Sequence, residues 1–222
     1  MSGDLHVLSS MATRALLAEL AVQWSAPVRV ESVGGVDAAK RVAAGEAFDV
    51  VVLASDAIDR LVAAGHLAAE SKVDLVRCDV AIAVPSGAPR PSVADEAGLR
   101  SAAAAAGRIA VSTGPSGVAL AKLLDRWGIA DRLVQAPPGV PVGRLLAQGE
   151  ADLGFQQLSE LIDLPGIAVL GTMPPGLEIV TTFSAARPAT RDAVDAVPLL
   201  AHWRSAATDE TKRRHGMMPA RD

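Results

Sequence analysis

Serines follow a short apolar run near the start of this sequence, in a layout that suits anion binding. The stretch HVLSSMATRALL begins at position 6, and its apolar run ends at Ser9 and Ser10 before leucines at helical spacing. A hydroxyl at this place can cap the helix, and the backbone N–H groups of a helix N-terminus attract an anion. Ser9 and Ser10 are therefore either ligand-binding residues or a plain cap. Arg14 could bind a carboxylate through two parallel hydrogen bonds, or it could be an ordinary surface arginine.

Two further strand ends carry small residues that could meet a ligand. In VGGVDAAKR, Gly34 and Gly35 follow a predicted strand, and glycine lets a backbone approach a ligand closely. The alternative for this pair is a tight turn. In ASDAID, Ser55 ends a strand and begins a helix, so it repeats the geometry of the first stretch, with a plain cap as the alternative.

The stretch VSTGPSGVALAK gives the strongest indication of an anion site. Thr113, Gly114, Ser116 and Gly117 lie between a strand and a helix, where hydroxyls and backbone N–H groups can surround an anion. The stretch lacks the G-x-x-x-x-G-K-[ST] pattern of a phosphate-binding loop. It also lacks the second glycine of a nucleophile elbow, because position 118 is valine. Gln156, at the end of a predicted strand, completes the candidate ligand-binding residues.

The histidines and the cysteine form no pattern of metal ligands. The four histidines are isolated in the sequence, and Cys78 is the single cysteine. We therefore expect neither a metal site nor a cofactor. His6 lies inside the first predicted strand, where it is either a hydrogen-bonded core histidine or a catalytic one.

Apolar strands alternate with amphipathic helices almost throughout the chain. This alternation predicts an α/β fold of mostly parallel sheets flanked by helices. We expect strands at 5–8, 28–32, 48–54, 78–85, 108–112, 132–136, 151–156, 167–171 and 177–186. We expect helices at 11–24, 37–44, 57–64, up to 106, 117–127, 141–148, 157–162, 189–204 and 206–214, with Gly65 as a C-cap.

The number of strands indicates two sheets, and hence two lobes. We place lobe 1 at residues 1–79 plus 177–222 and lobe 2 at 80–176, with the segment 177–186 returning as one antiparallel strand. The chain would then cross between the lobes twice. We expect these two crossings to form a hinge, with an interlobe cleft beside it. Ligands bind beyond the carboxyl ends of parallel strands, so the four candidate segments should converge on that cleft.

Composition excludes several classes of function. The net charge is −4, aromatic residues are 3% and tyrosine is absent, so we expect no nucleic-acid partner. No apolar run approaches the ~18 residues that cross a bilayer, so we expect no membrane insertion. One cysteine and no visible leader suit a cytoplasmic protein as written, or a periplasmic one if a leader was removed.

Six stretches together resemble the periplasmic molybdate-binding protein family. They are VLSSMATRALLAEL, AAGEAFDVVVLASDAIDRLVAAGHL, VDLVRCDVAIAVPSGAPRPS, RIAVSTGPSGVALAKLLDRWGIADRL, GEADLGFQQLSEL and GIAVLGTMPPGLEIVTTFSAA, and they span about four-fifths of the chain. The resemblance implies a two-lobed type II periplasmic-binding-protein fold that closes on a small anion. It also implies an ABC transporter permease as partner if the protein is exported. The stretches GEADLGFQQLSEL and MPPGLE are similar to a subgroup that resembles aconitate isomerase.

Departures from the oxyanion receptors of this family bear on the ligand. Their Ser-Ser-Gly-like turn is replaced by Val33-Gly34-Gly35, the second-lobe loop is short, and the family's tyrosine contact has no counterpart. We therefore expect a substrate-binding protein for a di- or tricarboxylate.

The alternative is an intracellular isomerase of an unsaturated polycarboxylate, similar to aconitate isomerase, which abstracts a proton and shifts a double bond. Such a reaction needs a base, and His6, Glu160 and Glu178 are the candidates. Glu178 stands where the subgroup resemblance implies glutamine.

Overall fold

The computed structural model describes residues 4–190 and 196–221, and the chain divides into two compact units. Unit 1 comprises Met1–Cys78 and Thr181–Asp222, and unit 2 comprises Asp79–Val180. The chain passes between the units twice: within a long strand after Cys78, and after Val180. Each unit has its own buried core residues, and the two units are described in turn.

Unit 1 has a mixed sheet with three parallel strands at its start. Strand β1 is parallel to β2 and β3, while β9 runs antiparallel to β3 and β10 antiparallel to β4. The strands are β1 (Leu5–Ser10), β2 (Val28–Val33), β3 (Val50–Ala54), the first part of β4 (Val73–Pro85), β9 (Val180–Ala186) and β10 (Met218–Pro219). The helices are α1 (Arg14–Val22), α2 (Gly35–Ala43), α3 (Ser55–Ala63), α8 (Ala196–Arg204) and α9 (Asp209–Arg214). Short 3-10 turns span Met11–Thr13, Ala69–Ser71 and Ala206–Thr208.

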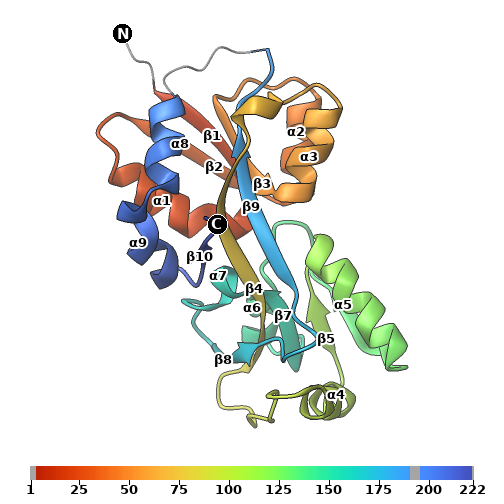
Figure 1. Ribbon diagram of the computed structural model, residues 1–222. Helices are drawn as coiled ribbons and strands as arrows, with labels where there is room; N and C mark the ends of the chain where they lie inside the picture. The colour runs from red at the N-terminus through yellow and green to blue at the C-terminus, as the bar shows by residue number, and fades with distance from the viewer. Residues whose placement is uncertain (1–3, 191–195, 222) are drawn as a thin grey trace. The chain divides into compact units, whose positions relative to one another are not determined.

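Helices cover both faces of the unit 1 sheet, which is why β3 is apolar at every position from Val50 to Leu53. Figure 1 shows α2 and α3 on one face of β1, β2 and β3, with α1, α8 and α9 on the other. Leu8, Val51 and Leu53 pack against Ile58 of α3 in one cluster. Full burial of one such side chain stabilises the fold by about 1.5–3 kcal/mol, so this core holds the strand ends of unit 1 in place.

Unit 2 combines parallel and antiparallel strands. Strand β5 is parallel to β6 and β7, while β4 runs antiparallel to β7 and β8. The strands are the second part of β4, β5 (Ile109–Val111), β6 (Leu133–Gln135), β7 (Leu153–Gln157) and β8 (Ile167–Thr172). The helices are α4 (Glu96–Ala105), α5 (Pro115–Arg126), α6 (Val142–Ala147) and α7 (Leu158–Leu161), with a 3-10 turn at Ala130–Arg132.

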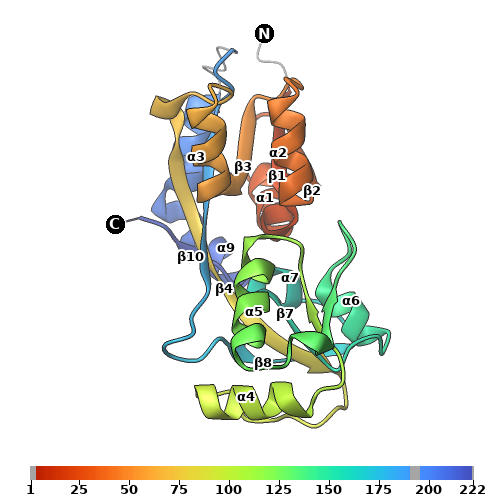
Figure 2. The ribbon, with the colours of Figure 1, turned by 90° about the vertical axis from the view of Figure 1, so that its right-hand side faces the viewer.

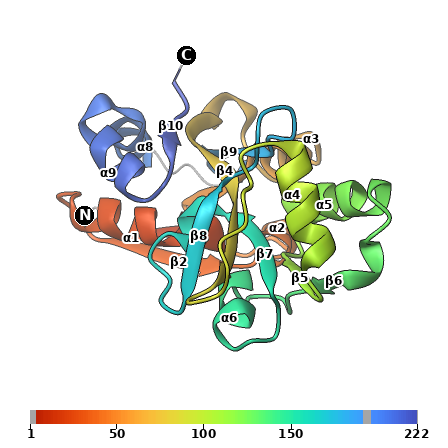
Figure 3. The same cartoon turned by 90° about the horizontal axis from the view of Figure 1, so that it is seen from below.

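Alternate residues of the unit 2 strands enter two different cores. Val80 and Ile82 join the cluster under α4 and α5, whereas Ala81 joins the cluster under α6 and α7. This is the two-residue period of a strand whose faces are both buried. Figure 2 shows α4, α5, α6 and α7 around these strands, and Figure 3 shows α4, α5 and α6 from below. Large side chains of β4 face α4 and α5, and small ones face the shorter helices.

The elements agree with the sequence prediction in type and order, and they differ in several details. The expected helix at 11–24 is a 3-10 turn followed by α1, and β10 was not expected. Gly65, the expected C-cap, has a φ of +77°. Part of the expected helix at 189–204 lies outside the described residues, because 191–195 are not described.

Strand β4 explains why two expectations about the sheets were wrong. We expected separate sheets and one antiparallel strand. Instead β4 is a member of both sheets, so the strand order reads as one path, β2-β1-β3-β9-β4-β7-β5-β6. Its pairing with β7, β8 and β10 adds further antiparallel ladders. A strand of 13 residues is long enough to pair in one unit with its first half and in the other with its second.

Candidate functional site

Three parallel strands of unit 1 end at the same edge of its sheet. Ser10 is in register with Val33, and Ser9 is in register with both Ser32 and Val52, so β1, β2 and β3 end side by side. The turn or helix that follows each strand begins at once, at Met11, Gly35 and Ser55. Two nine-residue helices, α2 and α3, therefore direct their N-termini, which carry partial positive charge, to this edge.

Ser10 has a buried hydroxyl with no hydrogen-bond partner among the described residues. Its side chain is 6% exposed and its Oγ makes no cap bond to the 3-10 turn that it precedes. Ser10 is therefore the N-cap residue of this turn by position, but its hydroxyl does not cap it. A Cβ added at Gly35 would lie 3.8 Å from the Ser10 Cβ, so the glycine backbone borders this hydroxyl.

Ser9 has partners within unit 1. Its Oγ lies 2.7 Å from the Oγ of Ser32 on the neighbouring strand, and it donates to the carbonyl of Ser10 at 3.3 Å. The side chain is fully buried. Ser9 therefore links β1 to β2 through its side chain, one residue before Ser10 at the end of the strand.

Gly34, Gly35 and Ser55 all lie at this edge. Gly34 is the N-cap residue of α2, and Ser55 is the first residue of α3, whose N-cap is Ala54. Ser55 is half-buried and Gly35 is exposed. The structure therefore brings these three candidates together with Ser10.

Arg14 and His6 lie differently from the other candidates of unit 1. Arg14 is exposed on the first turn of α1 and forms no hydrogen bond or ion pair within the described part of the chain. His6 is near the opposite end of β1, four residues or about 13 Å of strand from Ser10. Its Nε2 lies 3.3 Å from Glu31, and its ring packs edge-on against Phe48. This is the environment of a core histidine with a carboxylate neighbour.

The parallel strands of unit 2 make a second edge of the same kind. Val111 of β5 is in register with Phe155 of β7 and with Gln135 of β6, so the three strands end close together. Helix α5 follows β5 with Gly114 as N-cap and proline at its first position. Its twelve residues give this N-terminus a substantial dipole.

The residues from Thr113 to Gly117 form the turn into α5. Thr113 is exposed, while Ser116 is buried in the first turn of the helix. A Cβ at Gly117 would lie only 1.8 Å from the carbonyl oxygen of Ser112, so the turn closes directly over this glycine. Packing against the Ser112 carbonyl therefore requires glycine at position 117. The sequence alone predicts a ligand contact for the same glycine.

Gln156 and Glu160 form a polar pair at the end of β7. The Gln156 Oε1 accepts the backbone N–H of Val142 at 2.7 Å, and its Nε2 donates to Glu160 Oε1 at 2.8 Å. Gln156 is 4% exposed. Burial raises the pKa of Glu160 to about 7, and the Gln156 hydrogen bond opposes part of this rise. Glu160 therefore has both protonation states available near neutral pH.

Glu178, the third candidate base, lies in an exposed turn. Its Oε2 accepts the backbone N–H of Gly176 at 2.8 Å, two residues earlier. The carboxylate stabilises the turn that precedes β9. It belongs to neither of the two strand edges that hold the other candidates.

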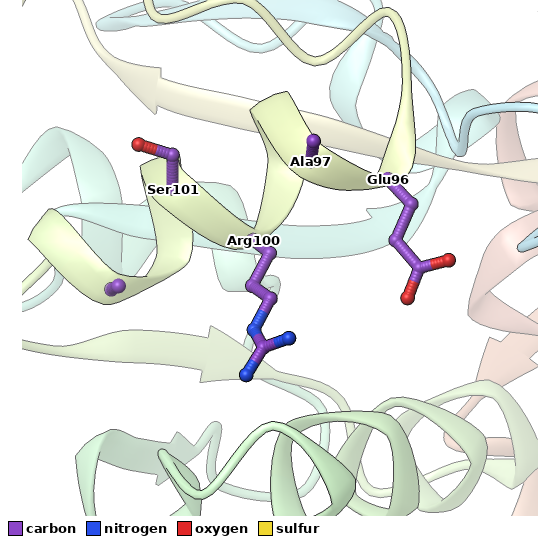
Figure 4. Close-up of a pocket in the computed structure, with 5 residues that line it drawn as sticks. Glu96, Ala97, Arg100 and Ser101 are labelled. Atoms are coloured by element: carbon purple, nitrogen blue, oxygen red, sulfur yellow. The ribbon is translucent and has the colours of Figure 1, made fainter.

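A pocket on α4 is lined by Glu96, Ala97, Arg100, Ser101 and Ala104, and none of these is a predicted site residue (Figure 4). Within residues 4–190 and 196–221, His, Cys, Asp and Glu form no group of three that could hold a metal ion. Across the same residues, every helix is too short or too polar to cross a membrane.

Sequence reasoning missed two residues that shape these edges. Ser32 is within hydrogen-bond distance of Ser9, and it could have been found from the parallel register of two strands that each carry serine near their end. Val142 supplies the N–H that orients Gln156, a contact over 14 residues that no local pattern indicates.

Comparison with known proteins identifies the family of the chain. A sequence model of the bacterial extracellular solute-binding protein family matches residues 5–218. A curated relative from a Pseudomonas species, named aconitate isomerase, is 39% identical over 150 residues. That match covers 66% of this chain and 57% of the relative, so the chain spans little more than half of the relative's length.

Solved structures show the same fold at low identity. The periplasmic molybdate-binding protein of Azotobacter vinelandii has a TM-score of 0.81 and 18% identity, covering 98% of this chain and 100% of its own. The substrate-binding domain of a putative molybdenum ABC transporter from Clostridium difficile has a TM-score of 0.74 and 17% identity, covering 99% and 100%. The chain therefore belongs to the bacterial extracellular solute-binding protein family and has the type II periplasmic-binding-protein fold that its sequence predicts.

Proposed function

We propose that this protein binds a small carboxylate anion and that Ser10 donates a hydrogen bond to it. The observation that carries the proposal is the buried Ser10 Oγ, which has no partner among the described residues. A buried hydroxyl left unpaired costs about 1–3 kcal/mol. A ligand oxygen at this edge of unit 1 removes that cost.

Helix dipoles favour a negative charge at the same place. The N-termini of α2 and α3 lie at the edge where Ser10 ends β1. Gly34 and Gly35 leave the start of α2 without side chains that would cover its N–H groups. We propose that the turn from Thr113 to Gly117 offers a second set of N–H groups at the strand edge of unit 2.

A carboxylate fits the donor set better than a tetrahedral oxyanion. Gly34 and Gly35 offer no hydroxyl, and the chain has no tyrosine, so a molybdate-like ion would lose at least two side-chain donors. Each unpaired oxygen costs on the order of 1–3 kcal/mol. The relative named aconitate isomerase, whose name denotes a tricarboxylate, supports the same choice.

A thermal-shift panel tests the binding function. We would use cis-aconitate, trans-aconitate, citrate, molybdate, tungstate, sulfate and phosphate, because a ligand at a hundredfold its Kd adds about 2.7 kcal/mol of stability. Ser10→Ala should weaken the best carboxylate by about 1 kcal/mol. Ser101→Ala, at an exposed position of α4, is the matched control. Equal thermal shifts by the carboxylate in both variants would show that Ser10 does not contact the ligand.

Isomerisation of an unsaturated polycarboxylate is the second candidate function. It is favoured by the relative named aconitate isomerase and by Glu160, whose pKa of about 7 suits a general base. Proton NMR of cis-aconitate or trans-aconitate incubated with the protein would detect the other isomer. Binding without conversion would leave the chain a binding protein.

A solute-binding protein delivers its ligand to a membrane transporter, and we propose an ABC transporter permease as the partner in that case. The likeness to the substrate-binding domain of a putative molybdenum ABC transporter supports this partner. Fractionation of the native cells tests it. A periplasmic protein supports transport, and a cytoplasmic one supports isomerisation.

A further inference from the structure

The Gln156 side chain is held in one orientation by the backbone. Its Oε1 accepts the N–H of Val142 at 2.7 Å, and a backbone N–H can only donate. The amide nitrogen must therefore lie on the other side, where it donates to Glu160 Oε1 at 2.8 Å. Gln156 is 4% exposed, and its bond to Val142 is buried.

This arrangement makes the two oxygens of Glu160 unequal. Oε1 is occupied by the amide of Gln156, and Oε2 has no hydrogen bond among the described residues. An oxygen that accepts an N–H is a poorer place for a proton than one that does not. A proton on Glu160 is therefore expected on Oε2.

Charged groups near Glu160 are few. The strands packed against α7 are β7, with sequence LGFQQ, and β8, with sequence IAVLGT, and neither contains a titratable residue. Helix α7 itself contains Glu160 as its single titratable residue. Asp163, just after α7, and Arg144, on α6, are both exposed. The protonation of Glu160 thus depends on its burial and on Gln156.

We propose that Glu160 is the acid–base group of the isomerisation, with Oε2 as the atom that exchanges the proton and Gln156 as its positioning residue. The proposal rests on the isomerase candidate of the preceding subsection. The pKa of Glu160, raised by burial to about 7, supports it, because a general base works best when its pKa is near the working pH.

The proton transfer that this assigns is balanced without a further reactant. Glu160 Oε2 takes a proton from the methylene carbon next to the double bond of an aconitate-like substrate. The electron pair of that C–H bond forms a new C=C bond, and the pair of the old C=C bond takes a proton at the far carbon. That proton comes from Glu160, so the carboxylate is restored and nothing is oxidised or reduced.

Glu160→Gln is the direct test, measured as conversion of cis-aconitate to trans-aconitate by proton NMR. A glutamine oxygen can still accept from Gln156, so the fold should survive, which circular dichroism checks. We expect conversion to fall by a factor of about 100 or more, with the thermal shift by the substrate retained. Glu150→Gln, which removes an exposed carboxylate from the same unit, should convert at the wild-type rate.

Three outcomes separate the proposal from the function on which it rests. No conversion by the wild-type protein would overturn the isomerase function itself. Conversion by Glu160→Gln at near the wild-type rate would overturn only the role of Glu160. Loss of conversion in Glu160→Gln with substrate binding intact supports both.

Gln156→Leu tests the positioning role by its pH profile. Removing the donor to Oε1 should raise the pKa of Glu160, so the rise of kcat/KM with pH should move upward by about one unit. Gln156→Asn, which keeps an amide on a shorter side chain, should recover part of that shift. Carboxyl carbon NMR of Glu160 should give the same displacement without substrate. A variant that loses activity with an unchanged pH midpoint would make Gln156 merely structural.

Discussion

Gly117 should be intolerant of any side chain because the backbone of Ser112 lies directly over it. A Cβ at this position would be 1.8 Å from the Ser112 carbonyl oxygen and 2.8 Å from its carbonyl carbon. Forcing extra atoms into a packed interior typically costs about 1–3 kcal/mol when side chains can move aside. Here the obstacle is backbone within the β5–α5 turn, so Gly117→Ala should lower the free energy of unfolding by about 3 kcal/mol or more.

Gly114 is the matched control, because it lies three residues earlier in the same turn. A Cβ there would meet nothing within 4 Å. Gly114 is the N-cap residue of α5, and exchanging glycine for alanine at an N-cap should cost less than about 1 kcal/mol. Urea unfolding followed by circular dichroism would measure both variants. Equal stability of Gly117→Ala and Gly114→Ala would refute the described geometry of this turn.

Three other predictions concern stability, each measured by urea unfolding. Ser32→Ala removes the 2.7 Å bond to Ser9 and should cost about 1 kcal/mol, and an unchanged midpoint would contradict that bond. Burial raises the pKa of Glu160 from 4.5 to about 7, so its neutral form favours folding. Its contribution, at most about 3 kcal/mol, is complete below pH 4.5 and lost as the pH rises through 7. Glu160→Gln should remove that part of the pH dependence. Lys212 is 1% exposed, and its Nζ lies 3.7 Å from Asp209 Oδ1. Lys212→Met removes one partner of this buried ion pair and should therefore lower the free energy of unfolding at pH 7, and an unchanged midpoint would show that the pair does not stabilise the fold.

The strand ends of both units could be predicted from sequence because the strands before them are buried. A continuous apolar run such as Val50–Leu53 identifies β3, and the polar residues after it identify the start of a helix. Ser10, Gly34 and Ser55 were placed at one edge by this reasoning alone. The same reasoning placed Thr113–Gly117 at the start of a helix, which the structure begins at Pro115.

Contacts between distant segments could not be predicted in the same way. The sequence shows that β4 is a strand, but its membership in two sheets depends on which neighbours each half meets. Gln156 was a candidate without a partner until Val142 and Glu160 were seen on either side of it. The raised pKa of Glu160 is a property of burial, which its place in the sequence does not determine.

Isothermal titration calorimetry of the whole chain with cis-aconitate and with molybdate would show which anion the protein binds and whether Ser10 contacts it. We predict that the tricarboxylate binds more tightly than molybdate, and that Ser10→Ala weakens its binding about fivefold, equivalent to about 1 kcal/mol. Submicromolar binding of molybdate together with no heat from cis-aconitate would contradict the proposed carboxylate site.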